Sequence, residues 1–329
     1  MNSLKRLSRA RETGILLAFL LVVVVTTVKN PAFVFSQDGF RDLLVTPMLV
    51  LLIAVGEAMV IITRNVDLSV GSVIGLTAYA AGTLFKYTDI PWPLVALIAV
   101  VGGAALGAIN GLLISIAKVP SLVITLGTLY AFRGINVVWT GSNRINSSDI
   151  PNDFQGIGTA QLLDVPVITI IAAVVLIGAA WYLRNTRGGR EFYAIGSDPD
   201  AANLYGLKVG RRVLLAFIVS GTLAGLAGVL YVARYGTVDS QAGTGFELQA
   251  VGAAVIGGVA IFGGIGSVWG AAIGAMLLLT INRALPVLGI QDFWQQAVVG
   301  ALIIAAIVLD RVLALRQARR LTVMEDSQA

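Results

Sequence analysis

The sequence predicts an all-α, polytopic membrane protein with about ten transmembrane helices and both termini in the cytoplasm. Of its 329 residues, 57% are hydrophobic and only 12% are charged, and the mean hydropathy is +0.86. No soluble domain needs so much apolar surface to build one core. Apolar stretches of about 17–25 residues, the length that a bilayer requires, recur along the chain. We therefore expect a single transmembrane domain over residues 1–329.

The first apolar run, from 14 to about 28, follows a cluster of basic residues, and no small-residue cleavage site comes after it. We therefore expect an uncleaved first span rather than a signal peptide. Nine further spans are predicted at 42–63, 68–86, 93–117, 120–139, 165–183, 212–233, 248–263, 266–285 and 294–310. Several are short or contain glycine, particularly around 248–285, so the number there stays open by one or two.

The distribution of Lys and Arg supports an even number of spans. If the N-terminus is inside, most basic residues fall in cytoplasmic segments, as the positive-inside rule requires. These segments include the start of the chain, the loop 184–212 and residues 311–320. The polar loop 140–164 then lies outside. The net charge of +5 is explained by this placement of basic residues on the cytoplasmic side of the membrane. It therefore gives no reason to expect a nucleic-acid partner.

The composition excludes several functions. The chain has no Cys and no His, which removes disulfides, thiol chemistry, zinc sites of the usual kind and imidazole catalysis. No GxxxxGK[ST] segment occurs, so the chain is not expected to bind ATP through a P-loop. The remaining carboxylates form no nucleophile–base pattern typical of an intramembrane enzyme.

The loop 184–212 contains a short predicted helix. Asp198 is a good N-cap, Pro199 fits the first helical position, and Gly206 ends the run. Apolar residues lie where a free loop would have polar ones, namely Ala201, Ala202, Leu204 and Tyr205. This pattern predicts a helix that docks on a partner. The alternative is an amphipathic helix lying on the membrane surface.

A polar segment, residues 64–71, separates two predicted spans. Asp67 and Ser69 can each cap the helix that follows, and Arg64 could pair with Asp67. The segment is either a capped helix start or an irregular break that lines a water-filled cavity. Glu57, inside the preceding span, is either a functional intramembrane carboxylate or a side chain that snorkels to the interface. Both alternatives stay open.

Residues 252–274 contain eight glycines, which favour close packing between membrane helices. Gly263, Gly264 and Gly266 are also expected to form a tight break between two spans. Ser267 and Trp269 would then begin the next helix.

Several motifs resemble one protein family. Asp200, Ala201 and Ala202, followed by Gly206, resemble the EAA-x-x-x-G coupling motif of bacterial ABC importer permeases, with Asp in place of Glu. The segments that resemble the ribose-type branch of these permeases, in order along nearly the whole chain, are 67–71, 120–128 with 133–134, 186–190 with 193–199, and 255–270. Residues 63–67 and 139–141 look most similar to permeases for autoinducer-2 and rhamnose. Gln249 departs from the ribose-type pattern, which usually has Asp there.

The resemblance implies a multi-pass permease of the bacterial cytoplasmic (inner) membrane. Its expected partners are a second permease subunit, two cytoplasmic ABC ATPase domains, an extracytoplasmic solute-binding protein and membrane lipid. ATP and Mg would bind in the partner ATPase, with no cofactor in this chain. The resemblance does not say whether the permease pair is a homodimer or a heterodimer.

The coupling region that the resemblance implies would insert its apolar face into a groove on the ATPase, with Arg190 and Asp198 at the rim. The candidate coupling residues are Arg190, Gly196, Asp198, Pro199, Asp200, Ala201, Ala202, Tyr205 and Gly206. We predict that Ala202→Arg places a charge in the docking face and abolishes coupling without unfolding the spans.

The expected cargo is a sugar or a sugar-like solute, which hydrogen bonds and aromatic faces can hold. Candidates along its path are Glu57, Asp67, Asn110, Thr125, Thr128, Asn136 and Trp139. The polar side chains among them could instead form hydrogen bonds between helices. An ion-coupled secondary transporter is the alternative function; it would need coupling carboxylates near the midplane, and only Glu57 fits that role.

Overall fold

The computed structural model describes residues 2–291 and also residues 294, 297, 298, 300, 301, 304, 305 and 308. The first half of the chain forms α1 (Asn2–Lys29), α2 (Ala32–Phe35), α3 (Gln37–Val45), α4 (Met48–Ile62), α5 (Val70–Tyr87), α6 (Trp92–Ala117) and α7 (Ser121–Thr140). A short segment follows, with η1 (Ser147–Asp149), α8 (Asn152–Thr159) and the hairpin β1 (Gln161–Leu162) and β2 (Val165–Pro166). The second half forms α9 (Val167–Asn185), α10 (Arg187–Ser197), α11 (Pro199–Leu204), α12 (Val209–Tyr235), α13 (Phe246–Ile256) and α14 (Val268–Val287).

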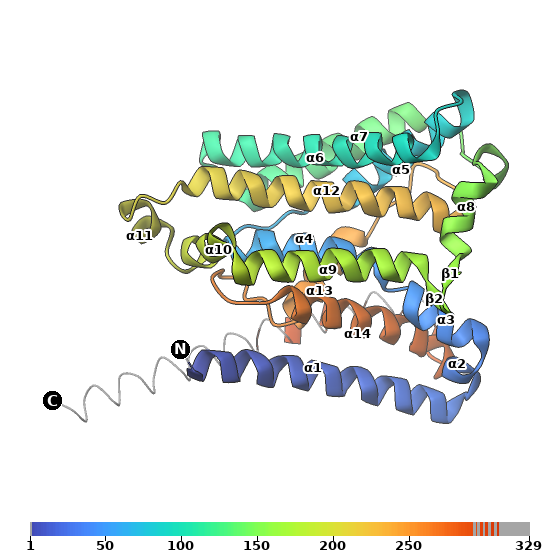
Figure 1. The fold of residues 1–329 in the computed structure, drawn as a ribbon, viewed down its shortest axis with the longest axis horizontal. Coiled ribbons are helices and arrows are strands. Elements are labelled where there is room, and N and C mark those ends of the chain that lie inside the picture. The colour runs from blue at the N-terminus through green and yellow to red at the C-terminus, as the bar shows by residue number, and fades with distance from the viewer. Residues whose placement is uncertain are drawn as a thin grey trace.

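The long helices lie side by side and give the molecule two distinct ends (Figure 1). The start of α1 lies at the same end as α10 and α11, which we call the α11 end. The short elements α2, α3, α8, β1 and β2 lie at the opposite end, the α8 end. The loops 184–212 and 140–164 therefore lie on opposite sides of the bundle, as the charge distribution predicts.

Seven segments of the described chain are long and apolar enough to cross a membrane: 12–29, 37–62, 92–117, 121–140, 167–185, 209–235 and 268–287. The predicted span 68–86 corresponds to α5, a helix that is not among these seven. The predicted span 248–263 is wrong, because α13 ends at Ile256 and an irregular glycine-containing segment follows. The predicted span 294–310 lies mostly outside the described residues.

Helix α4 is the centre of the bundle. All of its residues are buried, and it contacts α9, α12, α13 and α14. A helix that is apolar on all sides apart from one residue, and is enclosed, has no amphipathic face, which is typical of a helix surrounded by other membrane helices. The one ionisable residue in it, Glu57, is thus placed in the middle of the protein.

Helices α6 and α12 pack closely along their length through glycines. A side chain at Gly103 would collide with the backbone of Gly221 and Gly225, and one at Gly107 with the backbone near Phe217. Small residues at a helix interface let two backbones approach, and van der Waals contacts then hold the helices together inside a bilayer. The glycines of these two helices therefore serve packing.

Candidate functional site

Helix α11 forms as predicted from its capping residues. The Asp198 side chain accepts hydrogen bonds from the backbone amides of Asp200 and Ala201, at 3.1 and 3.0 Å, and Pro199 occupies the first turn. The helix ends one residue before Tyr205, and Gly206 adopts a φ of 79°, a conformation that favours glycine. The sequence pattern thus located this helix to within about one residue.

The exposed face of α11 differs from the prediction. Leu204 and Tyr205 are each 88% exposed, whereas Ala202 is only 5% exposed and faces the rest of the protein. The prediction that Ala202 belongs to the docking face is therefore wrong for this conformation. In a helix of barely two turns the apolar positions point in different directions, and the sequence alone did not distinguish the inner from the outer ones. Leu204 and Tyr205 are thus the large apolar side chains of this segment that a partner could contact.

Helix α10 precedes α11 and was not predicted. The Thr186 side chain caps it by accepting a hydrogen bond from the Gly189 amide at 3.0 Å, and Phe192 and Ile195 are buried on its inner face. The signal was present in the sequence, because Thr186 precedes apolar residues spaced three apart. Arg190 lies exposed on this helix and donates a hydrogen bond to the Asn185 carbonyl at 3.4 Å.

Helix α10 is attached to the core at Gly196. A side chain at this position would meet the Ile62 carbonyl and the Gly264 amide, so the backbones are in direct contact. The Gly264 amide also donates a hydrogen bond to the Ile62 carbonyl at 3.0 Å. Nearby, the Tyr193 hydroxyl donates to the Gly266 carbonyl at 3.0 Å. Burial raises the pKa of Tyr193 to about 12, with a smaller contribution from the charge of Glu12, so this donor stays protonated at neutral pH.

An ion pair joins α10 to α12. The Glu191 carboxylate accepts hydrogen bonds from Arg212 and from Arg187, which is four residues earlier on α10. The hydrogen bond from Arg212, and then the one from Arg187, hold the pKa of Glu191 below its usual value. This contact was not predicted; it fixes the two ends of the loop that carries α11.

The polar break, residues 63–69, is enclosed by a buried polar cluster that comprises Glu57, Asp67, Ser69, Asn110 and Ser220. The Asp67 carboxylate accepts hydrogen bonds from the Ser69 amide (3.0 Å), the Ser69 hydroxyl (2.7 Å) and the Ser220 hydroxyl (3.1 Å). The Asp67 amide donates to Glu57 at 3.1 Å, and the Asn110 amide group donates to the Ser69 hydroxyl at 2.7 Å. Helices α4, α6 and α12 therefore all bind the same break.

Two expectations for this break are corrected. Arg64 is exposed while Asp67 is buried, and the carboxylate is bonded to hydroxyl and amide groups rather than to Arg64. Ser69 occupies the N-cap position of α5 but makes no capping hydrogen bond there, because its hydroxyl bonds to Asp67. Glu57 is fully buried and does not snorkel. One of its carboxylate oxygens, Oε2, and the Asn110 carbonyl oxygen have no hydrogen-bond partner in the described chain.

Helix α7 closes the break from another side. The Ser121 hydroxyl accepts a hydrogen bond from the Val66 amide at 3.1 Å, and the Thr125 hydroxyl donates to the Val66 carbonyl at 3.2 Å. Thr125 is therefore brought to the break, as are Glu57, Asp67 and Asn110. Ser121 and Ser220 were missed in the sequence because a serine in an apolar span carries no positional signal.

The other predicted path residues lie elsewhere along α7. Thr128 donates a hydrogen bond within the helix, to the Thr125 carbonyl at 3.3 Å. Asn136 is buried and donates to the Ser240 carbonyl at 3.4 Å, and Trp139, 46% exposed, packs edge-on against Tyr79 at 5.3 Å between ring centroids. The structure thus divides the predicted path residues between the buried break and the far part of α7.

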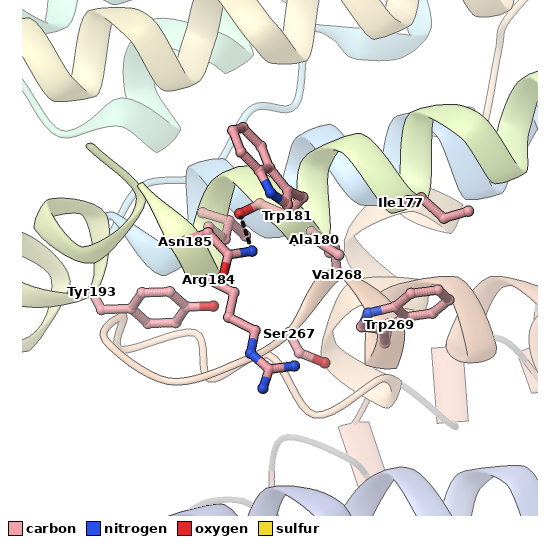
Figure 2. Close-up of a pocket in the computed structure, with 10 residues that line it drawn as sticks. Ile177, Ala180, Trp181, Arg184, Asn185, Tyr193, Ser267, Val268 and Trp269 are labelled. Atoms are coloured by element: carbon pink, nitrogen blue, oxygen red, sulfur yellow. Dashed lines mark hydrogen bonds between the residues drawn. The ribbon is translucent and has the colours of Figure 1, made fainter. Parts of the chain in front are cut away.

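A pocket of about 270 Å³ lies where α9, α10 and the start of α14 meet (Figure 2). Trp181, Arg184 and Asn185 enter it from α9, Tyr193 from α10, and Ser267 and Trp269 from the start of α14. The Asn185 side chain donates to the Trp181 carbonyl at 3.1 Å. Ser267 lies at the start of the next helix, as predicted, and it caps α14 by accepting a hydrogen bond from the Gly270 amide. Tryptophan and arginine side chains together are typical of a membrane–water boundary.

Within the residues that the structure describes, no group of three or more His, Cys, Asp or Glu side chains could hold a metal ion.

At the α8 end, the two loops that follow α7 and α12 form one surface. Ile145 and Val238 exchange backbone hydrogen bonds of 3.0 Å in each direction, and the Ser147 hydroxyl donates to the Gly236 carbonyl at 3.2 Å. Lys86 pairs with Asp149 at 3.2 Å. The hydrogen bond from the Asn146 amide, together with Lys86, holds the pKa of Asp149 below its usual value.

Comparison with known proteins identifies the family. Residues 39–307 match the family described as branched-chain amino acid transport system / permease component. The chain is 36% identical over 308 residues to the autoinducer 2 import system permease protein LsrC of Enterobacter sp. (strain 638), which covers 93% of this chain and 88% of that relative. It is 35% identical over 298 residues to the D-allose transport system permease protein AlsC of Escherichia coli (strain K12), with 90% of each chain covered. No solved structure matches the chain. The chain therefore belongs to this permease family, and it is a multi-pass transport component of the bacterial inner membrane rather than an enzyme.

Proposed function

We propose that the chain is the transmembrane permease subunit of an ATP-binding-cassette importer for a sugar or sugar-like solute. Its relatives act on autoinducer 2 and D-allose, and autoinducer-2, rhamnose and ribose remain the candidates from the sequence motifs. The observation that carries the proposal is the geometry of α11. Leu204 and Tyr205 protrude at its C-terminal end, while the backbone of α10 next to it is in direct contact with the core at Gly196.

The proposed topology follows from the two ends of the molecule. We place the α11 end in the cytoplasm and the α8 end outside, with about ten membrane helices in one domain and both termini inside. The start of α1 at the α11 end supports the inner position of the N-terminus. Exposed basic residues at the α11 end, including Arg64, Lys118, Lys208 and Arg211, support the cytoplasmic side.

The proposed partners dock at these two ends. Two cytoplasmic ATPase subunits, which hold ATP and Mg, would receive α11 and its neighbours Arg190, Asp198 and Gly206. An extracytoplasmic solute-binding protein would dock on the joined loops at the α8 end. A second permease subunit would pack beside the chain, and the face of α7 is a candidate because most of its residues are exposed.

We propose that the solute passes along α7. Asp67, Asn110 and Thr125 are enclosed in the polar break and bonded to neighbouring helices, so they shape the break. Thr128 and Trp139 are not enclosed and could meet a passing polyol. Aromatic faces and hydroxyl groups bind neutral sugars in this way. Ion-coupled secondary transport is disfavoured by family membership, because relatives are permease components of import systems.

The test is a detergent pull-down of the ATPase subunit encoded beside this chain, with the wild type and with Leu204→Arg. We expect the wild type to retain an ATPase that hydrolyses ATP and the variant to lose at least about 90% of it, because a charge replaces an apolar anchor. Leu163→Arg is the matched control, because Leu163 is 90% exposed near the hairpin at the α8 end.

Two results would contradict the proposal. One is equal loss of the ATPase by both variants, and the other is normal recovery and transport by Leu204→Arg. Thermal unfolding of the purified variants shows whether the bundle itself is intact.

A further inference from the structure

A cleft of about 750 Å³ opens at the α11 end, beside the pocket of Figure 2 but separate from it. Its walls come from the polar break, the end of α6, the α10–α11 segment and the start of α12. Four cationic side chains line it: Arg64, Lys118, Lys208 and Arg211. One carboxylate, Asp200, faces the same space. The cleft therefore carries an excess of positive charge in a chain with few charged residues.

These four cations come from three separate parts of the sequence. Arg64 follows the last turn of α4 and Lys118 follows α6, and both have positive φ values, 68° and 53°. Lys208 is the N-cap residue of α12, and Arg211 lies in the first turn of that helix. The fold thus brings together charges that are far apart in the chain.

None of the four forms an ion pair with another residue in the part of the chain that the structure describes. Arg212, the next residue after Arg211, is in contrast paired with Glu191. A group of unpaired cations in one concave site repels itself, and an anion relieves that repulsion. The cleft is therefore suited to an anionic ligand.

Neutral groups complete the lining. Thr63, Asn65, Ser115 and Asn203 supply hydroxyl and amide groups. The first turn of α12 lacks a side-chain cap, so its amide groups add positive partial charge at the same place. Ser115 donates a hydrogen bond to the Gly210 carbonyl at 3.1 Å, which joins the end of α6 to the start of α12.

We propose that this cleft binds a phosphate-bearing anion. Its volume is typical of a pocket for a small molecule, and Arg and Lys side chains with helix-terminal amides are the groups that bind phosphate. Pro199, Asp200 and Asn203 form one wall, so the bound anion connects the α11 segment to the polar break.

The positive-inside rule alone accounts for cations on this side of the membrane. It does not account for their meeting around one cleft together with neutral hydrogen-bonding groups. Arg184 illustrates the difference, because it lies at the same end and lines the other pocket. Substitution of Arg184 therefore serves as the control, because it removes a basic charge at the same end of the molecule without changing the cleft.

The experiment uses the purified full-length chain in a neutral maltoside detergent, without ATPase or transported solute. Inorganic phosphate is titrated by calorimetry, with chloride keeping the ionic strength constant. We expect saturable binding by the wild type, at least tenfold weaker binding by the double variant Arg64→Gln/Arg211→Gln, and a change of less than twofold for Arg184→Gln. Binding that does not saturate, or that weakens equally in all variants, overturns the proposal. Because the assay needs no ATPase, its result is independent of the coupling role of α11.

A second arm identifies the source of the phosphate group. The same titration is run in nanodiscs of phosphatidylcholine and of phosphatidylcholine with one quarter phosphatidylglycerol. If the anionic lipid weakens phosphate binding by the wild type, a lipid headgroup occupies the cleft; if it has no effect, the ligand is a soluble phosphate. In both cases the double variant must lose the binding, and its retention overturns the proposal. Thermal unfolding of the double variant confirms that it is folded.

Discussion

The two breaks in this bundle are held by different means. The polar break, residues 63–69, is fixed by side chains: Asp67 gathers donors from its own loop and from α12, and α7 holds Val66 from another side. The glycine break, residues 257–267, is fixed by backbone contacts, and Gly258, Gly263, Gly264 and Gly266 all have positive φ values. Buried polar side chains and glycine are thus two solutions to the same problem of satisfying irregular backbone inside a membrane protein.

The two breaks meet at one place. Gly264 donates to the Ile62 carbonyl at the end of α4, and Gly196 of α10 fits against both. Movement of the α10–α11 segment therefore reaches both breaks through backbone contact. We therefore expect the side-chain break to tolerate isosteric changes, and the contact between Gly196, Gly264 and Ile62 to exclude large side chains.

The largest effect is expected for Gly196→Val. The new side chain would collide with the Ile62 carbonyl and the Gly264 amide, neither of which is a flexible side-chain end. We expect a loss of at least about 4 kcal/mol, or no folded protein at all. The measurement is the midpoint of thermal unfolding in detergent. Gly178→Val is the control, because a side chain at Gly178 meets nothing within 4 Å. Equal midpoints for the two variants would show that Gly196 is not a contact point.

An intermediate effect is expected in the polar break. Asp67→Ala removes the acceptor for the Ser69 amide and for the hydroxyls of Ser69 and Ser220, at about 1–3 kcal/mol for each buried group left unpaired. Glu57→Gln keeps an acceptor for the Asp67 amide and should cost about 1 kcal/mol or less. Thermal unfolding of both variants measures the difference. If Glu57→Gln is as destabilising as Asp67→Ala, the charge of Glu57 itself matters to the break.

A smaller effect is expected for Gly264→Ala. Its φ of 73° costs an L-residue about 1–2 kcal/mol, and the added carbon would lie 2.8 Å from the Ser197 amide nitrogen. The matched control is Gly127→Ala, in the middle of α7, where nothing lies within 4 Å of the added carbon. There alanine should be neutral or stabilising, because it is the better helix former. Destabilisation by the control but not by Gly264→Ala would contradict the backbone account of the glycine break.

The smallest effect is expected for Glu191→Gln, which weakens the contact between α10 and α12 and leaves both breaks intact. Because hydrogen bonds from Arg212 and Arg187 lower the pKa of Glu191 in the folded protein, the ion pair stabilises the fold above the ordinary glutamate pKa of about 4.3. That stabilisation is lost as the pH falls through the lower, folded-state pKa. We expect Glu191→Gln to reduce stability by about 1 kcal/mol at pH 7. The difference from the wild type should vanish in acid, in unfolding midpoints measured from pH 7 to pH 3. A difference that persists unchanged at pH 3 would show that the carboxylate charge is not its cause.

Sequence reasoning located most of the long helices because bilayer-length apolar runs are a strong signal. The ranges 93–117 and 120–139 fall within about one residue of α6 and α7. It failed at 248–263, where glycine and apolar residues continue past the end of α13 at Ile256. The end of α13 and the glycine break after it have the same kind of composition. Only the positive φ values of the glycines in the break distinguish the two segments.

The candidate site was predicted in part. Asp198, Pro199 and Gly206 act locally, so their pattern defined α11. The burial of Ala202 and the bond from Ser220 to Asp67 depend on which helices pack together, and a single sequence does not contain that information in readable form. The coupling role of the α11 residues stays a prediction.

The packing of α12 against α6 has a mechanical consequence. Four residues separate the end of α11 from the start of α12, and the 27 residues of α12 span about 40 Å, from the α11 end to Tyr235 beside the joined loops of the α8 end. Its glycine contacts with α6 leave little room for sliding. A rod of this length acts as a lever: a tilt of about 5° at one end displaces the other by about 3.5 Å. Work done at the ATPase can thus reach the opposite face of the membrane without any change within the helix itself.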